Sequence, residues 1–372
     1  MDNVNLGPRT RTRTRRTRFV CISDTHNRTV KLPKGDVLIH CGDITNQGSF
    51  TELSKQVEWL EKADFECKLV VAGNHDLTLD TAFFEQYGAY FHNNVAQDPV
   101  GCQNLLTQSN SLTYLQHESR TIKLTSPSGP QTTFSIFGSP YTPKYGKWAF
   151  QYDTHNDADS DAIWKRIPLD TDILVTHGPA HTHRDETLHR GAVGCESLRR
   201  AMWRVRPRLA LCGHIHEARG VERVRWDLSD KHVRYKELDH AYEWRDPGEG
   251  NQKNSLVDLT VRGGVPLDND GSTAVSASTP QASSLTTAEP EAAGDANLAA
   301  GTNPGIGTQG LSGDPESARS DQAALAGRLG RRETCIVNCA IMTRERPRSL
   351  NKAIVVDLDL PFWEETSLPL PV

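Results

Sequence analysis

The sequence predicts an α/β fold, because short apolar segments typical of strands alternate with segments of helical periodicity. Most of the strand candidates are continuous apolar runs, which is typical of strands covered on both faces of a sheet. Several of these runs end in a small cluster of Gly, Asp, Asn and His residues. Because sites in α/β sheets form outside the carboxyl ends of strands, these clusters indicate one common site.

The expected elements can be placed in order along the chain. Leu53, Val57 and Leu60 have helical spacing. They predict a helix over 51–62, with Ser49 or Thr51 as its N-cap. A second helix is expected over 196–205. Strands are expected over 18–23, 36–40, 67–72, 132–137, 172–176, 209–212, 334–342 and 353–360.

Composition divides the chain into a folded part and two polar segments. Hydrophobic residues make up 36% of the 372 residues, which indicates that part of the chain builds no core. Residues 1–17 are rich in Arg and predict a disordered basic arm. Residues 264–333 lack aromatic side chains and predict a disordered low-complexity insertion. We therefore expect one domain, formed by 18–263 plus 334–363, because loop-closure entropy grows slowly with loop length.

Composition also argues against several classes of protein. No apolar run of about 18 residues is present, so we expect no membrane span. The first residues form no apolar signal segment, so we expect a cytoplasmic protein. A net charge of −5 argues against a chain that binds nucleic acid through its whole surface, although the basic arm could still contact nucleic acid. The eight cysteines form no C-x-x-C pair and are expected to be core thiols. The sequence leaves the oligomeric state open.

The polar clusters at the strand ends hold side chains that bind divalent metals. They are Asp24-Thr25-His26, Gly42-Asp43, Gly73-Asn74-His75-Asp76, His177-Gly178 and Gly213-His214-Ile215-His216. Asp and His bind borderline divalent metals, and Asn offers a neutral oxygen. One carboxylate can bridge two metals, and two metals can clamp a phosphate and activate water. Isolated buried carboxylates are costly, which argues against a purely structural role for these residues.

In this order, D-x-H, G-D, G-N-H-D, H-G and G-H-x-H resemble the motifs of the calcineurin-like metallophosphoesterase superfamily. Residues 137–143, 148–150, 176–179 and Gly194-Cys195 are similar to its metallophosphoesterase-domain-containing subgroup. The resemblance covers about 18–262 plus the last strands. It implies a four-layer α/β/β/α sandwich of two facing mixed sheets flanked by helices. The subgroup is associated with cyclic-nucleotide phosphodiesterase activity.

The resemblance also implies roles for single residues. The ligands that it implies for a first metal are Asp24, His26, Asp43 and His216. Those for a second metal are Asp43, Asn74, His177 and His214, so that Asp43 bridges the two. A hydroxide between the metals would attack phosphorus in line, His75 would protonate the leaving oxygen, and Asp76 would orient His75. Manganese or iron is favoured, and zinc or magnesium also suits such a mixed shell.

Three functions stay open at this point. The first is hydrolysis of a small phosphodiester such as a cyclic nucleotide. The others are a phosphomonoesterase, including a protein phosphatase, and a non-catalytic metal-binding scaffold. Residues 178–185 and Tyr141 depart from the subgroup pattern, which bears on the substrate. Four further histidines near the site in sequence could bind phosphate: His155, His181, His183 and His189. Three aromatic residues are expected to serve packing: Tyr141, Trp148 and Trp203.

Overall fold

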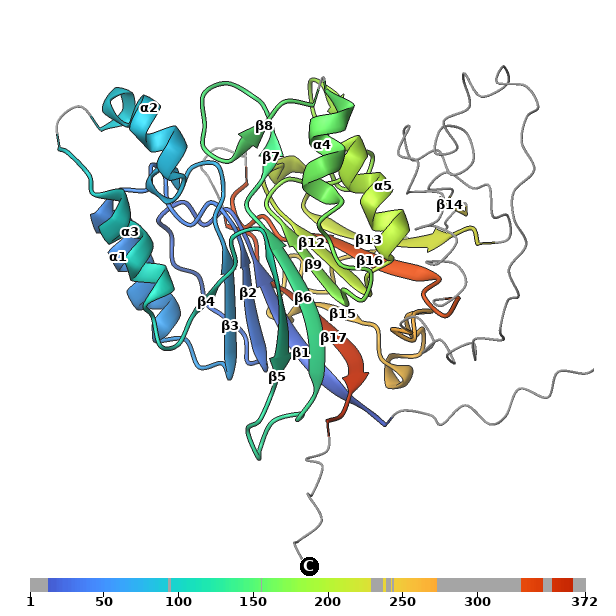
Figure 1. Cartoon of the computed structure of the whole chain (residues 1–372). Helices are drawn as coiled ribbons and strands as arrows, with labels where there is room; N and C mark the ends of the chain where they lie inside the picture. The colour runs from blue at the N-terminus through green and yellow to red at the C-terminus, as the bar shows by residue number, and fades with distance from the viewer. Residues whose placement is uncertain are drawn as a thin grey trace, which may run out of the picture.

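The computed structural model describes residues 13–92, 95–154, 156–228, 237–238, 242, 244–272, 329–343 and 350–363. In this part of the chain, two large mixed sheets face each other and helices cover their outer sides (Figure 1). The expected α/β/β/α sandwich is therefore confirmed. None of the helices in the described ranges combines the length and the apolar character that crossing a bilayer requires.

Both sheets mix parallel and antiparallel neighbours. The first sheet has the order β15 (Ser255–Asp258), β17 (Ile354–Pro361), β1 (Thr14–Ile22), β2 (Val37–Cys41), β3 (Cys67–Val71) and β4 (Thr113–Tyr114). The second has the order β14 (Glu237–Leu238), β13 (Gly220–Trp226), β16 (Glu333–Asn338), β12 (Leu209–Cys212), β9 (Ile173–Thr176), β6 (Thr133–Ser139) and β5 (Glu118–Lys123). The strands β1, β2 and β3 run parallel, as do β9 and β12, so their carboxyl ends meet at common edges.

Helices form the two outer layers of the sandwich. The first sheet is covered by α1 (Phe50–Glu61), α2 (Thr81–Phe91) and α3 (Pro99–Thr107), and the second by α4 (Asp157–Trp164) and α5 (Glu196–Val205) (Figure 1). Short elements complete the described part: η1 (Leu77–Leu79), η2 (His216–Ala218), η3 (Val261–Gly263), β7 (Thr142–Pro143) with β8 (Gln151–Tyr152), and β10 (Glu186–Thr187) with β11 (Gly191–Ala192).

Strand β1 shows why its sequence is continuously apolar. Successive side chains of a strand point to opposite faces. Phe19 and Cys21 belong to the core between the sheets, whereas Val20 and Ile22 belong to the core beneath α1. Helix α1 begins after Ser49, whose hydroxyl accepts from the Glu52 backbone N–H in a capping box, so that Ser49 rather than Thr51 is the N-cap.

The boundary drawn at residue 17 is corrected by the structure. Residues 1–12 of the expected basic arm lie outside the described residues. Residues 14–17, however, belong to β1 and pair antiparallel with β17. The Thr17 hydroxyl is buried and lies 2.6 Å from the Thr132 hydroxyl. The charge run therefore extends into a strand, which pairs with β17 and buries Thr17 while Thr14, Arg15 and Arg16 stay exposed.

The expected disorder of 264–333 is also corrected at both ends. Residues 273–328 lie outside the described residues, but 264–272 and 329–333 are packed against the domain. Asn269 bridges Arg331, and the Asp270 N–H donates to the Gly330 carbonyl. The Arg331 guanidinium is fully buried and donates to the carbonyls of Thr171 at 2.7 Å and Ser272 at 2.8 Å. These residues form a clasp, held by polar bonds that a count of apolar residues does not detect.

Candidate metal centre

The five polar clusters meet at one end of the sandwich. Asp24 follows β1, Asp43 follows β2, and Asn74 follows β3. From the other sheet, His177 follows β9, while His214 and His216 follow β12. Three groups of side chains could each hold a metal ion, since the donor atoms within each group lie within 4.8 Å of one another: Asp24, His26 and His216; His26, Asp43 and His75; and Asp43, His177 and His214. Asn74 lies beside the last group, with its Oδ1 3.0 Å from His177 Nε2. The structure therefore brings together all seven residues that the resemblance implied as ligands.

Left-handed backbone turns direct these side chains inward. Asp24, Asp43 and His214 have φ values of 55°, 53° and 67°. Asp and His adopt this region more readily than most residues do. The Asp24 N–H donates to the Gly42 carbonyl at 2.9 Å, which ties the two loops together. A Cβ at Gly213 would collide with the hydroxyl of Ser23 and the carboxylate of Asp24, so this turn needs glycine.

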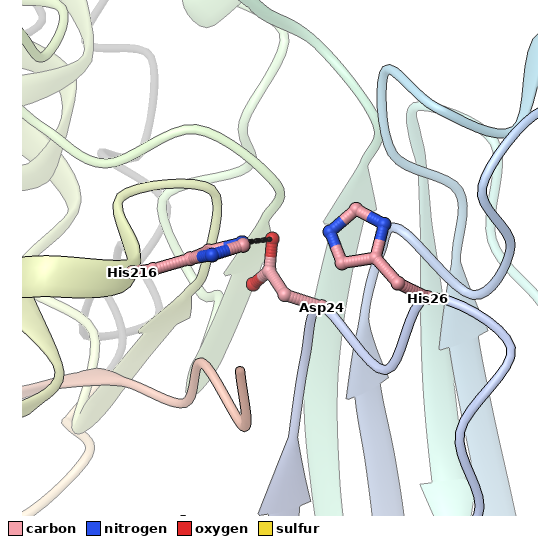
Figure 2. A group of neighbouring side chains, drawn as sticks. All are labelled: Asp24, His26 and His216. Atoms are coloured by element: carbon pink, nitrogen blue, oxygen red, sulfur yellow. Dashed lines mark hydrogen bonds and ion pairs between the residues drawn. The ribbon is translucent and has the colours of Figure 1, made fainter. Parts of the chain in front are cut away.

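The first donor group consists of Asp24, His26 and His216 (Figure 2). Figure 2 shows the Asp24 carboxylate between two imidazoles, which come from the loop after β1 and the turn after β12. His216 Nε2 lies 3.2 Å from Asp24 Oδ1. Asp24 is fully buried, and the His214 N–H donates to both of its oxygens at 3.1 and 3.0 Å. These contacts fix the carboxylate in one orientation.

The second donor group consists of Asp43, His177 and His214. His177 Nε2 lies 3.3 Å from Asp43 Oδ1 and 3.0 Å from Asn74 Oδ1. His177 Nδ1 lies 2.9 Å from the Cys41 carbonyl oxygen. A ring N–H donated to a carbonyl leaves the other nitrogen free for a metal. The amide oxygen of Asn74 therefore adds a neutral donor beside this group.

Asp43 joins the two groups. Its Oδ1 faces His177, while its Oδ2 lies 3.7 Å from His26 Nε2. The His75 backbone N–H donates to Oδ1 at 2.8 Å. The two oxygens of a single carboxylate thus face histidines from both donor groups. This is the placement that a carboxylate bridging two cations requires.

The electrostatics of the centre fit cations. In the described part of the chain, the ion pairs of Asp24 and Asp43 are all with histidines. Burial opposes ionisation of Asp43, but the facing His177 outweighs it and lowers the Asp43 pKa well below its usual range. Burial works against the charge of His177 as well, yet Asp43 raises the pKa of His177 to about 9. Two buried carboxylates without Lys or Arg partners form a donor set whose charge divalent cations would balance.

His75 and Asp76 are adjacent in sequence, but their side chains contact different residues. His75 Nδ1 lies 2.8 Å from the Asn46 carbonyl oxygen, and the ring stacks on Trp148 with centroids 4.0 Å apart. The Asp76 carboxylate instead accepts from the backbone of Gly73 at 2.9 Å and from Thr45 at 2.8 Å. The expectation that Asp76 orients His75 is thus wrong: Asp76 holds the loops together, and Asn46 and Trp148 hold the imidazole. Burial and the charge of Asp43 raise the pKa of Asp76 to about 6.

A cavity of about 620 Å³ opens over the metal centre. Besides His26, Asp43, Asn74, His75, His214 and His216, it is lined by residues that sequence reasoning did not assign to the site: Lys144, Tyr145, Trp148, Thr187, Arg190 and Glu217. His189 also lines it, as the sequence had left open. Trp148 belongs to the 148–150 segment that resembles the subgroup, and Glu217 follows the Gly213–His216 motif, but the sequence assigned neither of them to the site. Lys144, Tyr145, Thr187 and Arg190 are identified only by their place in the cavity lining.

Four other residues singled out in the sequence make contacts that favour a structural role. His183 is buried between Glu222, at 2.9 Å, and Glu237, at 3.2 Å. His181 is half-exposed and pairs with Glu196. Trp203 belongs to the core between the second sheet and its helices, and Tyr141 packs against that core, as expected. His155 lies outside the described residues.

Fold and donors together define an α/β sandwich with a candidate two-metal centre. The sequence matches the family model of calcineurin-like phosphoesterases over residues 17–218. This match covers more than half of the chain, and the chain belongs to the calcineurin-like phosphoesterase family.

Curated relatives support this membership. Metallophosphoesterase domain-containing protein 1 of Homo sapiens is 39% identical over 218 residues, 55% of this chain and 62% of that protein. UPF0046 protein K07C11.7 of Caenorhabditis elegans is 36% identical over 55% of this chain and 65% of that protein. A protein of Emericella nidulans named "Probable rhamnogalacturonate lyase C" is 41% identical over 64% of this chain but only 20% of its own length. The chain thus spans less than two thirds of these three relatives.

Solved structures overlap less closely. TT1561 of Thermus thermophilus has a TM-score of 0.35 and 10% identity, covering 56% of this chain and 84% of that one. Purple acid phosphatase PPD1 from yellow lupin has a TM-score of 0.31 and 11% identity, and the overlap covers 60% of this chain and 42% of that one. Overlaps this low carry no argument about the site.

Proposed function

We propose that the chain hydrolyses phosphoesters at a two-metal centre, and that its substrate is a small phosphodiester such as a cyclic nucleotide. The observation that carries this proposal is the Asp43 carboxylate, whose two oxygens face His177 and His26 beneath an open cavity. Two bound divalent cations would supply Lewis-acid activation of water and of the phosphoryl oxygens. Manganese or iron is favoured, while zinc or magnesium also suits the mixed donor set.

The chain's own residues would position the reaction. Asp24, His26, Asp43 and His216 would hold one cation, and Asp43, Asn74, His177 and His214 the other. His75 lines the cavity and would donate a proton to the leaving oxygen. The Asn46 carbonyl at Nδ1 supports this role, because it orients the ring by accepting from Nδ1, so that the doubly protonated imidazole would give up the proton on Nε2. The stack with Trp148 limits rotation of the ring.

The test uses the full chain loaded with metal. An aryl phosphodiester, cyclic nucleotides and an aryl phosphomonoester are compared as substrates. Asp43→Asn should abolish turnover, because a neutral amide cannot balance two cations. Asp64→Asn is the matched control, since Asp64 is exposed beyond the end of α1. Full diester hydrolysis by Asp43→Asn would overturn the assignment, and a preference for the monoester would favour the phosphomonoesterase.

His75→Ala separates catalysis from metal binding. We expect the metal content to stay unchanged and kcat to fall by roughly 10²–10⁴-fold. The loss should be larger for an alkyl leaving group than for p-nitrophenol, which leaves without a proton. Equal losses for both leaving groups would contradict the general-acid role. A joint loss of metal would instead make His75 a ligand, since its ring also lies within reach of His26 and Asp43. Metal binding without turnover of any ester would favour the scaffold.

A further inference from the structure

The rim of the cavity is built by two segments outside the metal motifs. The hairpin β10–β11 contributes Arg190, and the loop after β7 contributes Lys144 and Tyr145. The Arg190 guanidinium lies over the Tyr145 ring, 4.2 Å from its centroid, and donates to the Tyr145 hydroxyl at 2.9 Å. Tyr145 is 58% exposed, so this pair stands at the surface rather than in a core.

The positive charges of this rim have no carboxylate partner among the residues that the structure describes. Neither Lys144 nor Arg190 takes part in an ion pair there, whereas Arg199 pairs with Glu237 at 3.0 Å and Arg219 with Asp246 at 3.1 Å. Apart from Asp43, the acidic side chain that lines the cavity is Glu217. The cationic side chains of the rim therefore outnumber its acidic ones.

The hairpin that presents Arg190 is held in place on both sides. The Arg190 N–H donates to the Thr187 hydroxyl at 3.1 Å, which closes the turn. At the base, the Asp185 carboxylate accepts from the backbone of Thr182 at 3.0 Å and of Gly194 at 2.7 Å. Strand β10 also contacts η2, which begins at the proposed ligand His216. These contacts hold the backbone of the hairpin that carries Arg190 beside the turn of His216.

The fold has little need of this arrangement. An exposed cation–π pair contributes little to the stability of a fold. A guanidinium and an ammonium without carboxylate partners beside a phosphoester site are suited to bind an anion. We propose that Lys144 and Arg190 bind a second anionic group of the substrate, such as a phosphate or carboxylate. This inference rests on the proposed function. Within the small phosphodiesters it favours those that carry a further anion over a cyclic nucleotide, which carries a single negative charge.

The inference separates substrates by charge. A phosphodiester with a single negative charge would occupy the metal centre and leave the rim unfilled. A diester with a second anion would fill both. A hydrogen bond between charged groups is stronger than one between neutral groups. A doubly anionic substrate should therefore gain about tenfold or more in affinity for each bond it makes to the rim.

Binding of inert probes tests the rim without any turnover. Alkylphosphonates of increasing chain length are each paired with the analogue that ends in a carboxylate, and titrated calorimetrically into the metal-loaded chain. We expect at least one carboxylate analogue to bind tenfold or more tighter than its partner, with the advantage shrinking as salt rises. The double variant Lys144→Gln, Arg190→Gln should equalise each pair and leave alkylphosphonate binding unchanged. The double variant Arg120→Gln, Lys123→Gln changes two exposed side chains of β5 and controls for the same change in net charge.

The outcomes distinguish this inference from the proposed function. Equal affinities within every pair, or an advantage that survives in the double variant, would overturn the inference, as would failure of the loaded chain to bind any probe. If the carboxylate advantage depends on the rim but no phosphoester is hydrolysed, the rim assignment stands and only the hydrolase proposal fails.

Discussion

His183 provides the sharpest test of the electrostatics in this fold. Its side chain is 2% exposed and lies between Glu222 and Glu237, at the base of the hairpin that forms the rim. Burial opposes its charge, but the two carboxylates outweigh burial and raise its pKa from 6.5 to about 9. At about 1.4 kcal/mol per pKa unit, protonation stabilises the fold by on the order of 3 kcal/mol.

The sign of the pH dependence follows from a raised pKa. The stabilisation is fully present below pH 6.5, where His183 is protonated even in the unfolded chain. It is lost as the pH rises through about 9, where the folded protein releases the proton. His183→Gln should therefore destabilise the protein most near pH 6, and the difference from wild type should shrink by about 3 kcal/mol towards pH 10.

Urea unfolding at several pH values measures this difference. The matched control is His181→Gln, because His181 faces Glu196 at 3.2 Å but both side chains are 38% exposed. Exposed ion pairs contribute about 0–1 kcal/mol, so the control should show a nearly flat difference. A difference between wild type and His183→Gln that stays constant from pH 6 to pH 10 would refute the reasoning.

Three further outcomes are expected. Trp148→Ala should lower kcat by roughly fivefold to tenfold without changing metal content, because a stacked ring worth about 1 kcal/mol then no longer holds His75; Trp148→Phe should largely restore the rate. Gly213→Ala should lower both metal content and the free energy of unfolding, by about 1–3 kcal/mol, because its Cβ would collide with Asp24; normal metal content in this variant would contradict the crowding. When the free metal concentration is about 100 times its Kd, removing the metal with a chelator should lower the free energy of unfolding by about 2.7 kcal/mol, which is measured as a lower Tm. An unchanged Tm would argue against metal binding to the folded state.

The sequence predicted the parts of the fold that depend on local apolar pattern. The strands around Phe19, Leu174 and Leu209 were found because each is a short apolar run. Helix α5 was found to the residue, from 196 to 205. Strand β5 was missed, since its sequence ESRTIK is mostly exposed at a sheet edge. Helices α2, α3 and α4 were missed as well, because few of their side chains are buried and their apolar periodicity is weak.

Some parts of the candidate site could likewise be predicted from the sequence, and others could not. The proposed ligands could be predicted because each directly follows a strand, and strand ends converge in three dimensions. The partner of His75 could not be predicted, because the Asn46 acceptor is a backbone carbonyl and has no side-chain signature. Arg190 and Tyr145 are 45 positions apart in sequence, and only the folded chain brings them together.

The clasp between Asn269 and Arg331 has a consequence for how this protein can diverge. It lies just before β16, whose parallel neighbour β12 leads to His214 at its far end. A strand of about six residues spans roughly 20 Å, so the clasp and the candidate metal centre lie at opposite ends of the sheet, a full strand length apart. Ser272, the last described residue before 273–328, contacts Arg331 in this clasp. We therefore expect that a change in the number of residues between Ser272 and Leu329 leaves the positions of the proposed ligands unaltered, as long as the clasp forms.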